Sequence, residues 1–521
     1  MLIVGVDTGG TFTDFIFYKN GKWEVLKIPS TPENPAKAVL EGLKQIGEDK
    51  KYIVHGTTVA TNTLLERKGA KTAFITNKNF EDIVYIGRQN RKELYNLFYK
   101  RKKPLVSENL RIGIKGRINS KGEILEDISL EELKNTVKFL KEENVEAVAV
   151  SFLFSFLNNE HEKIVEEFLK KEGFLVSSSF RIVPEFREYE RASTVIINAY
   201  IMPKVKGYIS YLEEKIDKTD IFRIMQSNGG SLSPKAVKEE PVRTILSGPA
   251  GGVVGAYEIG KKAGFSKLIT FDMGGTSTDV SLINNNIPFS TETEISDLPI
   301  KVPIIDIHTV GAGGGSIAYI DEGGALNVGP ESAGADPGPV CYGKGENITV
   351  TDANLFLGRL IPEFFLGGHM KLDIERTSFF IKKLAKKINI SPIELAEGII
   401  TVANIKMEKA IKVISIEKGY NPSDFSLFSF GGAGGLHAVS LAKDLKIPKV
   451  IIPNNPGILS AMGMLMADII KDYSTTVMLS EKEAKFETLK KLFSILESKA
   501  FEELKKEGAK EIIFEKYVDI R

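Results

Sequence analysis

The sequence is poor in cysteine. Cys341 is the only cysteine among 521 residues, so the chain cannot form an internal disulfide bond. A chain without disulfides fits a reducing compartment, and we expect a cytoplasmic protein. The first residues run directly into an apolar strand pattern without a basic region or a cleavage site, so we predict no signal peptide. No apolar run approaches the roughly 18 residues that a membrane span needs.

The sequence also lacks an excess of positive or negative charge. The 69 Lys and Arg residues nearly balance the 68 Asp and Glu residues, so overall charge gives no reason to expect binding to nucleic acid or an anionic membrane. Residues 91–104 are basic with interleaved aromatic residues; nucleic-acid contact is one interpretation, and we favour a solvated face over a small apolar patch. Glutamine occurs only three times, while Lys, Glu and Ile are abundant. This bias is typical of thermophile proteins, although a biased base composition would produce it too.

The common phosphate-binding motifs are absent as well: neither GxxxxGK[ST] nor GxGxxG before a helix applies here. In their place, D-x-G-G-T-x-T-D occurs at residues 7–14 and again at 272–279, each time between two apolar runs. Each copy is predicted to form a β-hairpin. One copy is equally consistent with an ordinary turn. Two copies in matched settings indicate two related lobes that grip the phosphates of one nucleotide from opposite sides.

The residue types in this motif suit a phosphate and a divalent cation. Glycines let the backbone approach a ligand, and their amides can hold phosphate oxygens. Carboxylates repel phosphate unless a cation lies between them, and Mg²⁺ prefers carboxylate, phosphate and water oxygens. We therefore assign Mg²⁺ to Asp7 and Asp272, directly or through water, and expect one of them to orient the attacking oxygen. Asp14 and Asp279 are second choices that would otherwise pin their hairpins. The predicted phosphate-binding residues are Gly9, Gly10, Thr11, Thr13, Gly274, Gly275, Thr276 and Thr278.

Other segments organise the chain around these hairpins. Alternating strand and helix patterns before residue 180 predict βαβ units with a parallel sheet, including a helix that Ser129 caps. The stretch "FSFGGAGGLHA" predicts a strand, a glycine turn and a helix. Gly431, Gly432 and Gly434 would then border adenosine, with a plain strand–helix turn as the alternative.

Several motifs together resemble one protein family. The segments "GVDTGGTFTDF", "SGPAGGVVGA", "FDMGGTSTDVS", "HTVGAGGGSIA", "TVTDANLFLGRL" and "FGGAGGLHA" are similar to the A-type component of the ATP-dependent hydantoinase/5-oxoprolinase family, the N-methylhydantoinase A type, within the actin-like ATPase superfamily. The resemblance runs in order from residue 2 to about residue 475. It implies an α/β, two-lobed actin-like ATPase with the nucleotide in the interlobe cleft. The domains implied are 1–185, with the first hairpin, 186–480, with the second hairpin and adenosine loop, and 481–521.

The resemblance also implies an activity. We expect ATP- and Mg²⁺-dependent hydrolysis of a cyclic amide or imide through phosphorylation of its carbonyl oxygen, together with a B-type subunit. The alternatives are a component of an acetone-type carboxylase, a small-molecule kinase and an ATPase switch without its own chemistry. Family members usually continue past the strand expected at residues 516–521. Residues 481–521 are therefore expected to begin a C-terminal domain that is truncated here; a split gene, a separate chain or a truncated, inactive product would each explain this.

Substrate contacts are predicted less directly. The tentative contacts near an expected helix start are Thr57, Thr58 and Asn62. Arg88 could bind a carboxylate of the substrate. For each of these four residues, a purely structural role is the alternative. His308 with Asp306 is a weak candidate for a metal site. For Cys341 we favour a structural thiol over a nucleophile.

Overall fold

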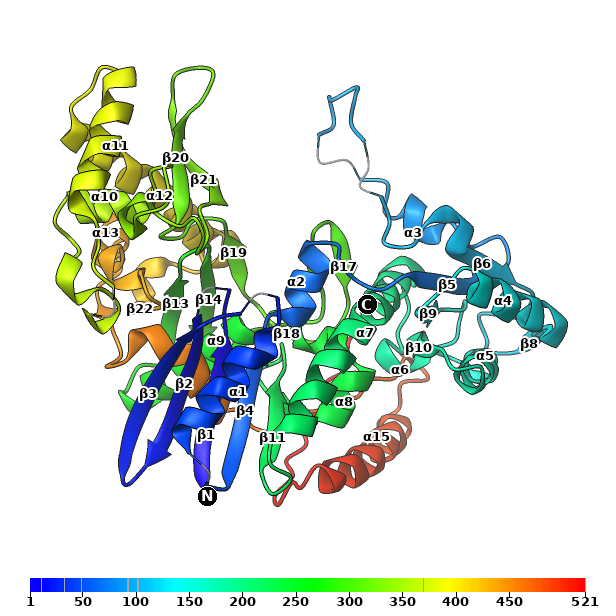
Figure 1. The fold of residues 1–521 in the computed structure, drawn as a ribbon. Helices are drawn as coiled ribbons and strands as arrows, with labels where there is room; N and C mark the ends of the chain where they lie inside the picture. The colour runs from blue at the N-terminus through cyan, green and yellow to red at the C-terminus, as the bar shows by residue number, and fades with distance from the viewer. Residues whose placement is uncertain are drawn as a thin grey trace. The chain divides into compact units, whose positions relative to one another are not determined.

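The computed structural model describes residues 1–10, 12–31, 33–47, 49–90, 93–100, 103–368 and 370–520 (Figure 1). The chain divides into two compact units, each built from several segments. Unit 1 comprises Met1–Gly56, Gly248–Phe289 and Ile305–Ala467. Unit 2 comprises Thr57–Ser247, Ser290–Ile304 and Asp468–Arg521. The predicted domain boundaries near residues 185 and 480 stay a prediction.

The first sheet of unit 1 contains the first copy of the repeated motif. Its strands are β1 (Leu2–Thr8), β2 (Phe12–Lys19), β3 (Lys22–Pro29) and β4 (Lys51–Thr57), and helix α1 (Pro35–Ile46) precedes β4. Within the unit the order is β4–β1–β2–β3, and β2 pairs antiparallel with both β1 and β3. Asn20 and Gly21 turn the chain from β2 to β3 with φ of 52° and 79°, as a two-residue hairpin turn requires.

The second sheet of unit 1 contains the other copy. Its strands are β13 (Lys267–Met273), β14 (Thr278–Asn284), β19 (His308–Val310), β22 (Ser426–Phe430) and β23 (Val450–Ile451). The order is β19–β14–β13–β22–β23. β13 and β14 form an antiparallel hairpin, whereas β22 lies parallel to β13 and so ends at the same edge as Asp272. The first strand of each predicted hairpin therefore lies inside a larger sheet.

Helices and one further hairpin complete unit 1. Its other elements are α9 (Ser247–Lys262), β20 (Ser316–Ile320), β21 (Leu326–Ser332), α10 (Val350–Phe356), α11 (Ile374–Lys387), α12 (Pro392–Ile414), α13 (Ala438–Asp444) and α14 (Leu459–Leu465). Ser391 and Glu394 form a capping box that starts α12, with Pro392 at its first turn. The buried face of α12, including Ile399 and Met407, packs into one core with Phe271 of β13.

Unit 2 contains a parallel sheet. Its strands are β5 (Thr72–Asn77), β6 (Arg111–Ile114), β9 (Ala147–Val150) and β10 (Leu175–Ser178), in the order β10–β9–β5–β6. All neighbouring pairs are parallel, which confirms the predicted βαβ organisation. Helix α4 (Leu130–Glu142) precedes β9, and α5 (Glu160–Lys171) precedes β10. The Ser129 side chain accepts a hydrogen bond from Glu132 N–H, as predicted for a cap.

The rest of unit 2 consists mainly of helices and short strands. They are α2 (Val59–Leu65), α3 (Ile83–Ile86), β7 (Arg117–Ile118), β8 (Ile124–Glu126), α6 (Ser179–Ile182), α7 (Glu188–Lys215), β11 (Ile221–Met225), β12 (Ser231–Leu232), α8 (Pro234–Glu239), β16 (Thr293–Ile295), β17 (Leu298–Ile300) and α15 (Phe486–Lys506). Two short strands, β15 (Phe289–Ser290) and β18 (Ile304–Ile305), lie at the unit boundaries.

One expected element is absent. The strand predicted near residue 517 does not form over the described residues 516–520, which pair with no strand. An apolar alternation becomes a strand only when another strand supplies hydrogen-bond partners. Among the described residues, no helix is both long and apolar enough to cross a membrane.

Candidate ATP site in unit 1

The repeated motif forms two hairpins of matching register. In the first hairpin, β1–β2, Asp7 lies directly opposite Asp14; in the second hairpin, β13–β14, Asp272 lies directly opposite Asp279. The spacing of seven residues around a four-residue turn produces this pairing. Like charges opposite each other destabilise a sheet, so the arrangement points to a function for these carboxylates.

The two turns also close in the same way. The Gly9 N–H donates to the Phe12 carbonyl oxygen at 3.0 Å, and the Gly274 N–H donates to the Ser277 carbonyl oxygen at 3.1 Å. A Cβ atom added at Gly10, Gly274 or Gly275 would meet no heavy atom within 4 Å. The turns therefore present bare backbone to open space, as close approach of a ligand requires.

The second threonine of each motif is buried instead of open. The Thr13 hydroxyl lies 3.1 Å from the Ser30 hydroxyl, and the Thr278 hydroxyl donates to the Ala312 carbonyl oxygen at 2.5 Å. Successive residues of a strand point to opposite faces, so each of these threonines points away from the aspartate that follows it. The predicted phosphate contact of Thr11 lies outside the described residues.

The third strand of each sheet supplies a different neighbour. Lys27 of β3 lies opposite Asp14, and its Nζ is 2.5 Å from Asp14 Oδ1. Thr309 of β19 lies opposite Asp279, and its hydroxyl donates to Asp279 Oδ1 at 2.5 Å. The first carboxylate pair therefore has a cation beside it, whereas the second pair has a neutral donor. Neither Lys27 nor Thr309 was predicted from the sequence, because the motif does not indicate which strand pairs with the second strand of each hairpin.

The electrostatics of the four half-buried carboxylates connect the hairpins. Burial raises the pKa of Asp7 to about 7, with Asp14 adding to the effect and Lys27 opposing it. Burial also raises the pKa of Asp14, against Lys27, and raises the pKa of Asp279 to about 6. The pKa of Asp272 is raised most strongly, by burial first, then by Asp279, Asp7 and Asp14. The charges of both aspartates of the first hairpin therefore act on Asp272 of the second hairpin.

A glycine loop at residues 311–316 supports the second hairpin. The Gly314 N–H donates to the Gly274 carbonyl oxygen at 3.0 Å, and the Gly315 N–H donates to the Gly275 carbonyl oxygen at 2.6 Å. A Cβ at Gly313 would lie 2.7 Å from backbone atoms of the hairpin turn, so only glycine fits. The loop therefore fixes the carbonyl side of the turn. The glycine-rich segment is visible in the sequence, but nothing in the sequence indicates that it supports the hairpin turn.

The loop after β22, residues 431–435, packs against the same hairpin. Gly431 has φ of 79°, and a Cβ there would lie 2.3 Å from Asp272 Oδ1. The Ala433 N–H donates to the Met273 carbonyl oxygen at 2.9 Å. Gly431, predicted beside adenosine, thus packs against the Asp272 carboxylate, while a Cβ at Gly432 would meet nothing within 4 Å.

In the rest of the β22 loop, Gly434 is tightly packed whereas Gly435 has open space beside it. A Cβ at Gly434 would lie 2.9 Å from the Ser429 hydroxyl oxygen, which is buried and has no hydrogen-bond partner among the described residues. A Cβ at Gly435 would again meet nothing. Of the three glycines predicted to border adenosine, Gly432 faces the most open space.

The start of helix α9 approaches the first hairpin. A Cβ at Gly248 would lie 3.4 Å from Asp7 Oδ1, and a Cβ at Gly56, at the end of β4, would lie 3.3 Å from the same atom. The N-terminal end of a helix favours negative charge, so α9 is suited to a phosphate near Asp7. A Cβ at Gly463 of α14 would lie 1.9 Å from the Gly251 carbonyl oxygen of α9, so the two helices need glycine where they touch.

The residues predicted to contact substrate belong to unit 2. Arg88 is held by Glu190 through two hydrogen bonds of 2.7 and 2.6 Å, which raise the pKa of the guanidinium. Glu190 is buried, while the Arg88 side chain stays about half exposed. The charge of Arg88 is therefore already paired within the unit.

The remaining three tentative residues lie at the start of α2. The Val59 N–H donates to the Thr57 hydroxyl at 3.2 Å, and the Asn62 amide donates to the Thr58 hydroxyl at 3.3 Å. These contacts stabilise the first turn of α2. Substrate contact by Thr57, Thr58 and Asn62 stays a prediction.

The hairpins offer at most two aspartates to one metal ion, and no larger set of metal-binding side chains converges among the described residues. Among the described residues, no group of three or more His, Cys, Asp or Glu side chains is placed to hold a metal ion. Asp306, the partner considered for His308, forms an ion pair with Lys418. Cys341 is buried, and burial together with Asp352 raises the pKa of its thiol. This environment fits the structural thiol that we favoured.

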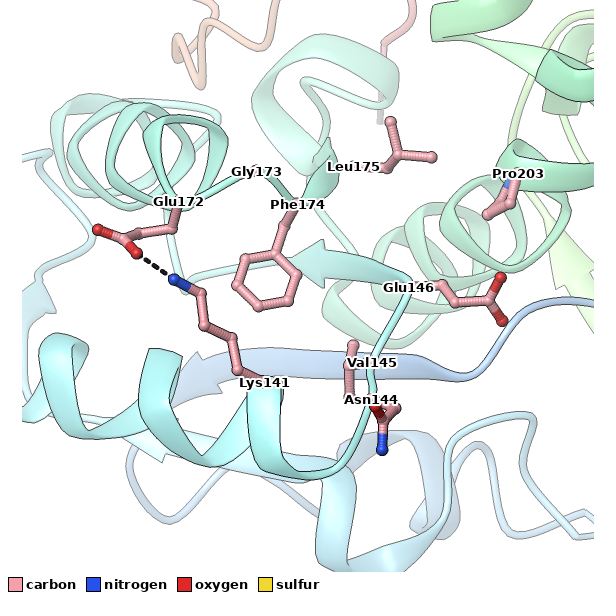
Figure 2. Close-up of a pocket in the computed structure, with 9 residues that line it drawn as sticks. All are labelled: Lys141, Asn144, Val145, Glu146, Glu172, Gly173, Phe174, Leu175 and Pro203. Atoms are coloured by element: carbon pink, nitrogen blue, oxygen red, sulfur yellow. Dashed lines mark hydrogen bonds and ion pairs between the residues drawn. The ribbon is translucent and has the colours of Figure 1, made fainter.

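A surface cavity of about 550 Å³ lies in unit 2, beside the ends of α4 and α5 (Figure 2). Lys141 and Glu172 form an ion pair of 2.5 Å at one side of it, and the Phe174 ring lies between that pair and Val145 in the view. None of the predicted site residues lines this cavity. Its lining residues are Lys141, Asn144, Val145, Glu146, Glu172, Gly173, Phe174, Leu175 and Pro203.

Comparisons with known proteins identify the family of this chain. The predicted α/β fold is shared with two ATP-dependent enzymes of known structure. Sequence models of the Hydantoinase/oxoprolinase family match residues 191–473 and, for its N-terminal region, residues 3–173. The chain belongs to the hydantoinase/oxoprolinase family.

Two relatives and two solved structures illustrate the similarity. The caprolactamase alpha subunit of Pseudomonas jessenii is 38% identical over 91% of this chain and 71% of its own length. A crystal structure of ATP-dependent caprolactamase from that organism has a TM-score of 0.86 at 35% identity, covering 98% of this chain and 77% of the other. The 5-oxoprolinase of Dictyostelium discoideum is 35% identical over 99% of this chain, which spans only 46% of that protein. A nucleotide-free acetone carboxylase structure has a TM-score of 0.77 at 31% identity, covering 89% and 70%.

Proposed function

We propose that this chain is the ATP-hydrolysing subunit of an enzyme that opens a cyclic amide or imide. The observation that carries the proposal is the pair of matched hairpins in unit 1, in which the other three aspartates raise the pKa of Asp272 further. The relatives named caprolactamase and 5-oxoprolinase supply the substrate class, since caprolactam and 5-oxoproline are both cyclic amides.

The residues fit a Mg²⁺–ATP complex. Carboxylates whose pKa values are raised by burial and by one another are stabilised as anions when a divalent cation joins them. Mg²⁺ bound there would neutralise charge on the phosphates during transfer. Asp7 and Asp272 are the residues that would hold it, directly or through water, because Asp14 and Asp279 are already bonded to Lys27 and Thr309.

The backbone would hold the nucleotide. The amides of Gly10 and Gly275 would face the phosphates, since the Gly9 and Gly274 N–H groups close their own turns, and the start of α9 would add its positive end near Asp7. Gly432 would leave room for adenosine beside β22. Preorganised donors of this kind stabilise the charge that develops in phosphoryl transfer.

The chemistry follows from the poor reactivity of an amide. The amide oxygen attacks the γ-phosphorus of ATP, the bond to the β-phosphate oxygen breaks, and ADP leaves. Water then attacks the activated ring carbon, the carbon–nitrogen bond breaks with a proton passing to nitrogen, and a second water releases phosphate from the acyl phosphate. One ATP and two waters thus yield ADP, phosphate and the ring-opened amino acid.

Companion chains belong to the same proposal. The caprolactamase relative is named as an alpha subunit, which supports a complex with a second, B-type subunit. The acetone carboxylase relative supports one alternative, in which the phosphorylated oxygen belongs to a ketone or its enol.

The test is an ATPase assay with and without the B-type subunit from the same genome. We expect 5-oxoproline, hydantoin or caprolactam to stimulate phosphate release, with one ring-opened product per phosphate by mass spectrometry. Stimulation only by a ketone with bicarbonate would favour the carboxylase. A stable phosphorylated product would favour a kinase, and no stimulation by any of these compounds would favour a switch.

A further inference from the structure

Helix α10 contacts the glycine loop at residues 311–316 and also His437, which lies just beyond the β22 loop. Thr351 contacts the glycine loop at residues 311–316, through two hydrogen bonds to the Gly314 carbonyl oxygen. The Thr351 N–H donates to it at 2.7 Å and the Thr351 hydroxyl at 2.8 Å. The Gly314 N–H in turn donates to the Gly274 carbonyl oxygen. A single residue, Gly314, therefore links Thr351 to the turn of the second hairpin.

The other contact runs towards the β22 loop. Asn354 lies three residues after Thr351, so both project from the same side of α10. The Asn354 amide lies 3.4 Å from His437 Nε2, and His437 Nδ1 lies 2.7 Å from Asn404 Oδ1 of α12. An amide oxygen only accepts, so Nδ1 carries the proton and Nε2 accepts from Asn354. His437 lies two residues after the β22 loop and is buried.

The α10 turn is itself fixed. Asp352 accepts hydrogen bonds from the Val340, Cys341 and Thr349 N–H groups at 3.1, 2.8 and 2.8 Å, and Thr349 and Asp352 form a capping box. Asp352 and Asn354 are almost completely buried. A buried turn held by several hydrogen bonds moves as one body, so Thr351 and Asn354 keep a constant separation.

We propose that Thr351 and Asn354 are positioning residues that set the second phosphate hairpin and the β22 loop at the separation one nucleotide requires. This inference rests on the proposed ATP-dependent function. It assigns a task to the motif "TVTDAN", for which the sequence suggested none. Thr351 would act on the phosphate side alone, whereas Asn354 would act on the adenosine side.

The experiment measures equilibrium binding of Mg²⁺–ATP and of adenosine to the full chain. Thr351→Val removes one hydroxyl hydrogen bond and keeps the shape, so ATP affinity should fall about fivefold while adenosine affinity stays unchanged. Thr351→Ser retains the hydroxyl and should bind ATP like the parent protein. Asn354→Ala should weaken both ligands, and the double variant should lose less ATP affinity than the two single effects combined, because both act on one turn.

The outcomes separate the two proposals. If the parent protein binds ATP and Thr351→Val weakens ATP and adenosine equally, or neither, the positioning role is wrong and the ATP site stands. Strictly additive effects of the two substitutions would also contradict it. If the parent protein binds no ATP, the proposed function fails and this inference fails with it. Equal melting temperatures of Thr351→Val and Thr351→Ser show that any difference in binding is not a loss of folding.

Discussion

Replacing Asp7 with asparagine should stabilise the ligand-free protein and abolish its ATP turnover. The pKa of Asp7 is raised from its ordinary 3.8 to about 7, chiefly by burial and next by Asp14. That difference corresponds to roughly 4 kcal/mol in the free energy of unfolding at a pH above both values. Because Asp7 is half-buried and water reaches part of it, we expect a gain of about 2–4 kcal/mol at pH 8.

The sign of the pH dependence follows from proton binding. Between about pH 4 and pH 7 the folded protein keeps a proton on Asp7 that the unfolded chain has released, so stability falls as the pH rises through this window. Asparagine has no proton to lose. The advantage of Asp7→Asn should therefore be largest at pH 8, smaller at pH 5 and absent below about pH 4.

The assay is urea unfolding at pH 5 and pH 8 without nucleotide or divalent cations, paired with phosphate release. Asp424→Asn is the matched control, because Asp424 is exposed and lies in the same unit. An Asp7→Asn variant that is no more stable than the parent at pH 8 would refute the reasoning about buried, mutually repelling carboxylates. Undiminished ATP turnover in that variant would refute the assignment of Asp7 to the site.

Two further predictions concern single contacts. Gly431→Ala should destabilise the protein by about 2–3 kcal/mol and reduce ATP turnover more than tenfold, because a methyl at φ of 79° would lie 2.3 Å from Asp272 Oδ1. The control is Gly432→Ala, whose methyl would enter open space and whose stability should be within about 0.5 kcal/mol of the parent. Equal stability of the two variants would contradict the packing described. Glu507→Gln should lower the free energy of unfolding in urea by about 3 kcal/mol, because Glu507 pairs with the buried Arg223 at 3.2 Å and accepts from the Ser233 hydroxyl at 2.7 Å. The control is Glu497→Gln, which breaks a more exposed pair with Lys516 and should lower it by less than about 1 kcal/mol. A larger loss in Glu497→Gln than in Glu507→Gln would contradict this prediction.

The hairpins could be predicted from the sequence because their information is local. The spacing from Asp7 to Asp14 contains the turn and both strand ends, and the same spacing recurs at Asp272. The pairing of each aspartate with its partner then follows from strand geometry alone. Local capping was predictable for the same reason, as Ser129 illustrates.

The supporting contacts were not predictable because they join distant parts of the chain. Lys27 and Thr309 reach the carboxylates through the order of strands in each sheet, which no local pattern encodes. Arg88 finds Glu190 at a separation of 102 residues. Thr13 and Thr278 follow the motif yet point to the opposite face, so a shared motif does not mean a shared direction.

The central claim is that both hairpins hold one nucleotide. Equilibrium titration of Mg²⁺–ATP onto the parent protein, Gly10→Val and Gly275→Val tests it most directly, since both side chains would enter the open space before a turn. The account predicts one ATP per chain and at least tenfold weaker binding in each variant. Two ATP molecules per chain, or a variant in either hairpin that binds ATP as tightly as the parent, would contradict it.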